Sequence, residues 1–290
     1  MVLKKLNEVG IVIVSATSDN PTANWRMFEL LGAKLFQKNP KVSLNIQNCL
    51  GVPVFVTLDA CHLIKLIRNA LGDFKNIITE AGETISWNHI VNLHQLQKEK
   101  GLHLGTKLRE AHIDYKSNKM KVRLATQVFS NSCSDALTFC EQTLKLPQFV
   151  GCGATAHFLK LFNDLFDILN SRNKFGKYYR APISSKNIHH YQQFFDYIAH
   201  YICNLKLDNG KLIIESTRKQ AFLGFLILMK SFVYVYKCYV QTGHLDYILT
   251  FKFSQDHIET FFSAIRRSLG NNNNPTPKQV HYLCLLVCLN

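Results

Sequence analysis

From its start to Gly72, the chain alternates between short apolar runs and polar turns. Residues 11–14 and 52–58 are compact and rich in β-branched side chains, which predicts two buried strands. Each run leads into an aspartate, Asp19 or Asp59, and then into a helical pattern, over residues 23–35 and 63–71. This repeated order of strand, aspartate and helix predicts an α/β sheet, in which carboxylates just beyond strand ends are common sites of chemistry. For Asp19, a role as a turn or cap residue stays open.

Apolar residues recur at helical spacing through most of the remaining chain. The helices predicted from this spacing cover residues 87–98, 108–114, 125–144, 154–172, 189–205 and 218–241. The last of these is long and very apolar, so we expect it to be central to the second half. Its most apolar part, residues 221–229, is followed by Lys230 and Ser231, and so short a run predicts a core helix rather than a membrane span.

One more helix is predicted near the end of the chain. Ser254 is a suitable N-cap, and Asp256 falls in the first turn, where a carboxylate suits the positive end of the helix dipole. The apolar positions expected to be buried are Ile258, Phe261, Phe262, Ile265 and Leu269. Asp256 and Glu259 project together from another face, an arrangement that can hold acidic ligands rigidly beside a metal or a base. An ordinary amphipathic helix with solvated charges is the alternative.

Charge and cysteine content narrow the class of protein. Thirty-four lysines and arginines against twenty acidic residues give a net charge of +14, which favours a polyanionic partner such as nucleic acid. The nine cysteines include no CxxC pair, which favours a reducing compartment over a disulfide framework or a zinc finger. For Cys284 and Cys288, packing in a core is favoured over ligation. With no recognisable signal peptide, we expect a soluble intracellular protein without a membrane partner.

Three side chains of the predicted helix 154–172 suggest recognition of a base. Phe166, Asp167 and Asn170 lie within about one turn. An aspartate can accept two N–H groups from a guanine edge, an aromatic ring can stack on the base, and an asparagine can bind carbonyl or ribose groups. No GxxxxGK[ST] motif is present, so an ordinary P-loop is excluded. The alternative is an aromatic core residue beside a cap-like aspartate.

The order of four motifs is more specific than any one of them. They are SDNPTAN at residues 18–24, LDACHLIKLIRNAL at 58–71, LFDILNSR at 165–172 and FSQDHIETFFSAIRRSLGNNNNPT at 253–276. Together they resemble the P element-type DNA transposase family, which includes the THAP-domain transposases, over nearly the whole chain. The last motif is the most specific, because it combines the acidic helix with an Asn-rich loop.

The resemblance implies an α/β, RNase H-like domain interrupted by a mainly helical GTP-binding insertion domain. The implied boundaries are 1–72 and 216–290 for the parts of the RNase H-like domain and 73–215 for the insertion. In this family three acidic residues hold two divalent metal ions, Mg²⁺ or Mn²⁺, that cleave and transfer DNA strands. By resemblance Asp19 is the second catalytic carboxylate and metal ligand, and Glu259 is the third.

The resemblance also implies nucleotide contacts, with GTP as a positioning cofactor rather than a fuel. Phe166, Asp167 and Asn170 match the base-recognition turn of the family, and Asp256 matches a residue near its magnesium ion. Four more positions fall at a suitable separation for other contacts with the nucleotide: Lys107, Lys121, Val122 and Ser130. The implied partners are transposon-end and target DNA, GTP and, for a full-length protein, a second copy of the chain. The implied location is the nucleus.

The sequence departs from the family pattern at its start. The first catalytic aspartate belongs on a strand well before Asp19, whereas Asp19 already lies close to Met1, and no THAP zinc finger precedes it either. We therefore expect a transposase fragment that does not cut DNA by itself, with Asp59 as the nearest acid that could replace the missing ligand. The alternatives are a domesticated, non-catalytic regulator that binds nucleotide and DNA, and an unrelated helical GTP-binding module.

Overall fold

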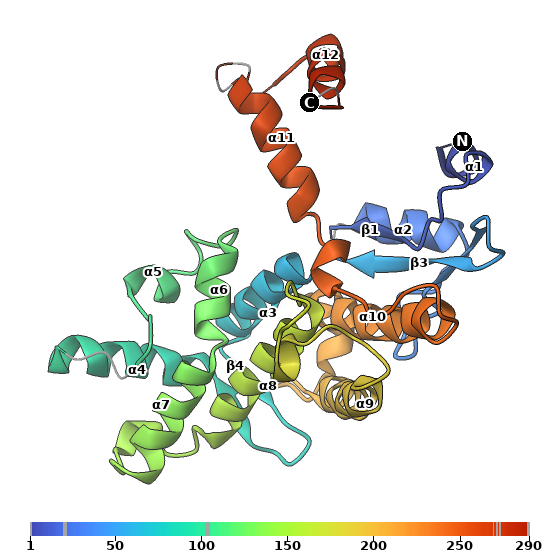
Figure 1. The fold of residues 1–290 in the computed structure, drawn as a ribbon. Coiled ribbons are helices and arrows are strands. Elements are labelled where there is room, and N and C mark those ends of the chain that lie inside the picture. The colour runs from blue at the N-terminus through green and yellow to red at the C-terminus, as the bar shows by residue number, and fades with distance from the viewer. Residues whose placement is uncertain are drawn as a thin grey trace. The chain divides into compact units, whose positions relative to one another are not determined.

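The computed structural model of this chain describes residues 2–19, 22–101, 105–268, 270, 272 and 274–288. The chain divides into two compact units, Met1–Phe253 and Ser254–Asn290, and each is considered by itself. The mixed α/β class predicted from the sequence is confirmed, since a small sheet and many helices make up the first unit (Figure 1). The domain boundaries at residues 72 and 215 stay predictions.

A three-stranded sheet has the order β1-β3-β2. The middle strand β3 (Pro53–Leu58) runs parallel to β1 (Ser15–Ser18) and antiparallel to β2 (Ser43–Gln47). Buried apolar side chains dominate β3, as its sequence predicts. The helix α1 (Val2–Glu8) precedes the sheet in the chain.

The first strand begins later than predicted. Residues 11–14 have no regular structure, although the carbonyl of Val14 accepts the N–H of Phe55 at 3.1 Å and so begins the ladder. Ile11 and Val12 are exposed. The prediction was wrong because Ser15–Ser18, whose side chains are small and mostly polar, form a strand by pairing with β3 and not through their own hydrophobicity. The edge strand β2 was not predicted.

The helices α2 (Thr22–Leu30) and α3 (Ala60–Phe74) follow β1 and β3 in the chain, and α10 (Lys219–Val235) comes much later. The helix α2 ends earlier than predicted, because Gly32 adopts φ +102° and turns the chain. The helix α10 packs against both β3 and α3 (Figure 1). The contact is close, since a Cβ on Gly224 would lie 2.3 Å from Cδ2 of Leu63.

The helix α10 continues as one π-helical turn, Tyr236–Val240. Residues Lys219–Val240 form one helix that is long and apolar enough to cross a membrane by length and composition, with a mean hydropathy of 1.5. The apolar stretch of this helix is therefore longer than the run 221–229 indicated by the sequence. Two thirds of it (67%) is buried within the protein, which agrees with the predicted core helix.

Between α3 and α10 the chain is mainly helical. A two-stranded sheet of β4 (Asn76–Ile78) and β5 (Thr84–Ser86) precedes the helices. These are α4 (Trp87–Lys100), α5 (Glu110–Ile113), α6 (Val122–Val128), α7 (Asn131–Gln142), α8 (Gly153–Leu169) and α9 (Ile188–Asn204), with short 3₁₀ turns at Pro147–Phe149, Tyr178–Arg180 and Ile213–Glu215. The helices predicted near α4, α8 and α9 are confirmed.

The single helix predicted over residues 125–144 is wrong. The structure has α6 and α7 instead, because Ser130 is extended and caps α7 by accepting the N–H of Cys133 at 3.3 Å. At the same break Phe129 contacts Phe158 and Phe162 of α8, with ring centroids 6.0 and 5.9 Å apart. An apolar contact and a cap together favour two helices over one.

The first unit closes with a 3₁₀ turn, Thr250–Phe253, and the second unit contains α11 (Asp256–Ser268) and α12 (Pro277–Cys288). Ser254 caps α11 as predicted, with its Oγ 3.4 Å from the N–H of Asp256. Ile265 is buried, whereas Ile258 is 54% exposed, and Phe261 and Phe262 are also exposed. The second unit by itself therefore does not cover the apolar face that the sequence predicts to be buried. Leu269 and the side chains of Cys284 and Cys288 lie outside the described residues.

Candidate functional site

Asp19 and Asp59 follow the carboxyl ends of β1 and β3, which are neighbouring parallel strands. Ser18 pairs with Leu58, and the N–H of Asp59 donates to the carbonyl of Ser18 at 3.2 Å. The two aspartates therefore begin at the same edge of the sheet. Carboxylate oxygens are the ligands that Mg²⁺ and Mn²⁺ prefer, so this donor set fits a divalent metal ion.

The two carboxylates have different local partners. Half-buried Asp19 accepts a hydrogen bond from Nδ2 of Asn24 at 2.7 Å. Asp59 is buried and caps α3, since its Oδ1 accepts the N–H of Cys61 at 2.8 Å. Asp19 thus has the more accessible carboxylate, while Asp59 also stabilises the first turn of α3.

Asp256 and Glu259 occupy the first turn of α11, in the second unit. Their spacing of three positions places them on one helical face, as predicted. Asp256 is half-buried and Glu259 is exposed. The meeting of Glu259 with Asp19 stays a prediction, since the two residues belong to different units. Among the described residues, no group of three or more His, Cys, Asp or Glu side chains is placed to hold a metal ion.

The predicted base-recognition turn ends α8. Phe166 packs half-buried against the core, and Asp167 accepts the Nε–H of Arg180 at 2.9 Å. Burial raises the pKa of Asp167, although Arg180 opposes this effect. Asn170 ends the helix, and its Oδ1 is buried without a hydrogen-bond partner in the described structure. A buried acceptor without a donor fits a ligand that brings an N–H group.

A pocket of about 730 Å³ lies between residues 106–112 and 121–127. Three of the predicted nucleotide contacts line it: Lys107, Lys121 and Val122. Two basic residues that the sequence analysis missed, Arg109 and Arg123, line it as well, and no described lining residue is acidic. Four cationic side chains around one cavity suit the phosphates of a nucleotide.

The other predicted contacts do not line this pocket. Ser130 caps α7 and donates its hydroxyl to the carbonyl of Gln127, a lining residue, at 3.0 Å. Phe166, Asp167 and Asn170 are not among the lining residues either. The structure therefore brings three of these four predicted nucleotide contacts together at one pocket, whereas Ser130 contacts the lining residue Gln127.

Two buried basic groups, His112 and Arg68, hold the segments that form the pocket. His112 lines it, and its Nε2 lies 2.9 Å from Oε1 of Gln127; burial lowers its pKa. Arg68 is fully buried, and its Nη2 donates to the carbonyls of Asn118 and Lys119 at 2.9 and 3.1 Å. Burial lowers the pKa of Arg68 to about 10, so it stays charged at neutral pH. Arg68 thus fixes the turn that leads into Lys121.

Two family models match the chain. Residues 61–182 match the "TNP-like, GTP-binding insertion domain", and residues 251–280 match the "TNP-like, RNase H C-terminal domain". The first match covers α3, the basic pocket and the turn at the end of α8. The second covers α11 with Asp256 and Glu259.

Two curated proteins are similar over most of this chain. DNA transposase THAP9 from Homo sapiens is 32% identical over 278 residues, which cover 95% of this chain and 30% of that protein. Transposable element P transposase from Drosophila melanogaster is 29% identical over 296 residues, which cover 97% of this chain and 36% of that protein. The chain therefore spans about a third of the length of these relatives.

One solved structure is similar in fold. The chain matches the Drosophila P element transposase strand transfer complex with a TM-score of 0.81 and 27% identity. The match covers 97% of this chain and 61% of that one. Similarity of sequence and of fold therefore extends across nearly the whole chain rather than being confined to one motif.

Proposed function

Because the chain belongs to the P element-type DNA transposase family, we propose that it contributes to metal-dependent cleavage and transfer of DNA strands with GTP as a positioning cofactor. The observation that carries this proposal is the place of Asp19, at the carboxyl end of a parallel strand beside β3. Carboxylates at this edge are what the family resemblance leads us to expect, and they support the proposal. DNA as the substrate makes the nucleus the proposed place of action.

In the proposed mechanism Asp19 and Glu259 hold divalent metal ions. When bound, such ions activate an attacking oxygen and stabilise the leaving oxygen of a phosphodiester. Asn24 orients the Asp19 carboxylate through its 2.7 Å hydrogen bond. Asp59 stands at the same edge and is the candidate for a further carboxylate ligand. Asp256, in the same helical turn as Glu259, is proposed to lie near the magnesium ion of the nucleotide.

In the insertion domain, each nucleotide contact is proposed from the chemistry of its side chain. The Asp167 carboxylate accepts the N1 and N2 hydrogens of guanine, the buried Oδ1 of Asn170 accepts a further N–H group, and Phe166 packs beside the base. Lys107 and Lys121 bind phosphate oxygens together with Arg109 and Arg123. The positioning role proposed for the nucleotide rests on the family resemblance, and the basic pocket would bind its phosphates without a Walker motif.

The nucleotide part is tested by titrating a fluorescent GTP analogue into the chain and into variants of the pocket. Lys107→Ala and Lys121→Ala are expected to weaken GTP binding about tenfold each, since a hydrogen bond to a charged group contributes about 1.5–3 kcal/mol. Guanosine, which lacks phosphates, should bind these variants and the wild type alike. Lys98→Ala, an exposed lysine of α4, is the matched control. Equal GTP affinity in all proteins would refute the proposed pocket.

The catalytic part is tested with transposon-end DNA, Mg²⁺ or Mn²⁺ and GTP, with Glu259→Ala as the control for contaminating nucleases. We expect no cleavage by the chain alone. Cleavage that is lost in Glu259→Ala would contradict that expectation and support the catalytic proposal directly. DNA and GTP binding without any cleavage would agree with that expectation and with the non-catalytic regulator alike.

A further inference from the structure

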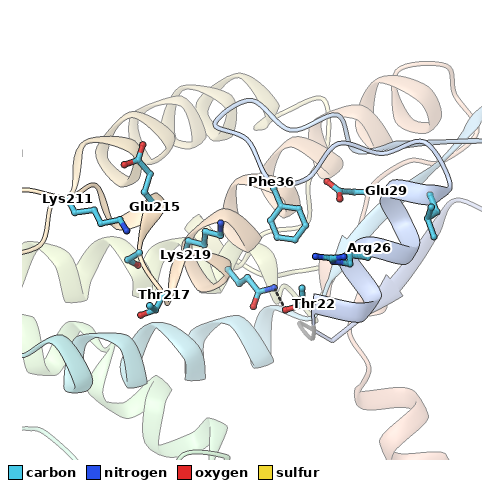
Figure 2. Close-up of a pocket in the computed structure, with 11 residues that line it drawn as sticks. Thr22, Arg26, Glu29, Phe36, Lys211, Glu215, Thr217 and Lys219 are labelled. Carbon is cyan, nitrogen blue, oxygen red and sulfur yellow. Dashed lines mark hydrogen bonds between the residues drawn. The ribbon is translucent and has the colours of Figure 1, made fainter.

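A second large cavity, of about 890 Å³, begins close to the proposed catalytic edge. Thr22, the first residue of α2, lines it and lies shortly after Asp19 in the chain. The Oγ1 of Thr22 accepts a hydrogen bond from Nε2 of Gln220, in the first turn of α10, at 3.1 Å. Figure 2 shows this bond beside a space bordered by α2, Phe36 and the segment that leads into α10. The cavity therefore joins the start of α2 to the start of α10.

Basic side chains enter the cavity from both sides. Arg26 comes from α2, whereas Lys211 and Lys219 come from segments much later in the chain (Figure 2). Two lining residues are acidic, Glu29 and Glu215. The Oε1 of Glu29 accepts the backbone N–H of Leu35, beyond the end of α2, at 3.3 Å. With three basic and two acidic side chains, the described lining carries a formal charge of +1.

The remaining polar lining consists of hydrogen-bond donors suited to phosphate oxygens. Hydroxyl groups come from Thr22, Ser216 and Thr217, and a carboxamide comes from Gln220. The 17-residue helix α10 has no acidic residue in its first turn. The positive end of its dipole is therefore not neutralised by its own side chains, which adds to the attraction of an anion.

The aromatic ring in the cavity favours a phosphate backbone over a free nucleotide. The ammonium group of Lys219 lies 5.6 Å from the centroid of the Phe36 ring, and the Trp25 ring lies 5.0 Å from the same ring. Phe36 is thus already packed between neighbours and is poorly placed to stack on a base. At the same time it fixes Lys219 beside the cavity.

We propose that this cavity, formed by α2, Phe36 and the start of α10, binds the phosphate backbone of the DNA strand whose cleavage is assigned to the neighbouring edge. The inference rests on the proposed function for its substrate class. Arg26, Lys211 and Lys219 neutralise successive phosphates, and the hydroxyl groups fix the register of the strand. Contacts of this kind position DNA without reading its sequence.

The test measures binding of fluorescein-labelled single-stranded DNA by anisotropy at several salt concentrations. The variant Arg26→Gln/Lys211→Gln/Lys219→Gln is compared with Lys98→Gln/Lys100→Gln/Lys186→Gln, which removes the same charge from exposed positions outside the cavity. Each lost phosphate contact lowers the slope of log K against log salt by about 0.7 for single strands. We expect the cavity variant to lose a slope of about 2 and the control variant to change little.

Circular dichroism and thermal unfolding establish that both variants are folded. The charge-preserving variant Arg26→Lys/Lys211→Arg/Lys219→Arg should keep the wild-type slope. Equal slopes in the cavity and control variants would overturn this inference and leave the proposed function intact. Weaker GTP binding with an unchanged DNA slope would also overturn it, by assigning the cavity to a nucleotide. A wild-type chain that binds no DNA would overturn both proposals.

Discussion

Asp19 and Asp59 leave the sheet side by side, each directly after the paired positions Ser18 and Leu58 of two parallel strands. The hydrogen bonds of their carboxylates nevertheless differ. Asp59 caps α3 with its carboxylate, whereas Asp19 is oriented by the side chain of Asn24. Substitutions can therefore separate a stabilising role from a role in binding metal.

Asp59→Ala should lower the free energy of unfolding by about 1 kcal/mol, because the N–H of Cys61 loses its cap. Asp59→Asn should keep most of the stability, since asparagine also caps helices. Asp19→Asn should change stability little. Urea denaturation gives the stabilities, and Mn²⁺ titration of the same proteins gives the metal affinity. If Asp59→Asn is stable but binds Mn²⁺ as the wild type does, Asp59 does not contribute to metal binding.

Asp167 should confer a preference for guanine. Its carboxylate can accept both the N1 and N2 hydrogens of guanine, whereas adenine lacks this pair of donors. The expected preference for GTP over ATP is roughly ten- to a hundredfold, since a charged hydrogen bond is worth about 1.5–3 kcal/mol. Competition of GTP and ATP for a fluorescent GTP analogue measures it. An unchanged GTP affinity in Asp167→Ala would contradict the assignment.

On acidification, GTP affinity should begin to fall at a higher pH than it would if Asp167 had the ordinary pKa of an aspartate. Burial raises the pKa of Asp167, and a protonated carboxyl group no longer accepts both guanine hydrogens. Arg180 lowers this pKa, so Arg180→Gln should move the midpoint of the pH profile to higher pH. Binding isotherms from acidic to neutral pH, with Asp167→Asn as the non-titrating control, test the sign. A midpoint that moves to lower pH would be contrary to this account.

Gly224→Ala should destabilise the first unit. Its Cβ would lie 2.3 Å from Cδ2 of Leu63, where α10 meets α3, and such overpacking typically costs about 1–3 kcal/mol. Gly153→Ala is the matched control, because its Cβ would meet only Oε2 of Glu141 at 3.7 Å. The melting temperature of Gly224→Ala should therefore be lower than that of Gly153→Ala. Equal melting temperatures would show that α10 accommodates the added methyl group without loss of stability.

The long helices were predictable because their apolar periodicity extends over many turns, as in α8 and α10. The strands were harder to predict. The strand β1 consists of Ser15–Ser18, and its burial depends on β3, a partner that is distant in the sequence. The strand β2 does alternate, with Leu44 buried and Asn45 exposed, but so short a strand gives a weak signal.

The basic pocket was only half predictable. The family resemblance indicated Lys107 and Lys121, whereas Arg109 and Arg123 were missed although each lies just beyond one of these lysines. Their meeting depends on how the turn before α6 folds back, which Arg68 fixes from α3. Periodicity within one segment carries no information on such contacts between segments.

The position of α10 in the chain has a consequence for synthesis on the ribosome. The strand β3 ends at Leu58, whereas the helix that packs on it ends only at Val235. At a translation rate of about 5–20 residues per second, α10 is synthesised roughly ten seconds or more after β3. During that interval the nascent chain presents an uncovered sheet face, which makes it a ready client for chaperones. The rate of translation between β3 and α10 thus influences the yield of folded protein.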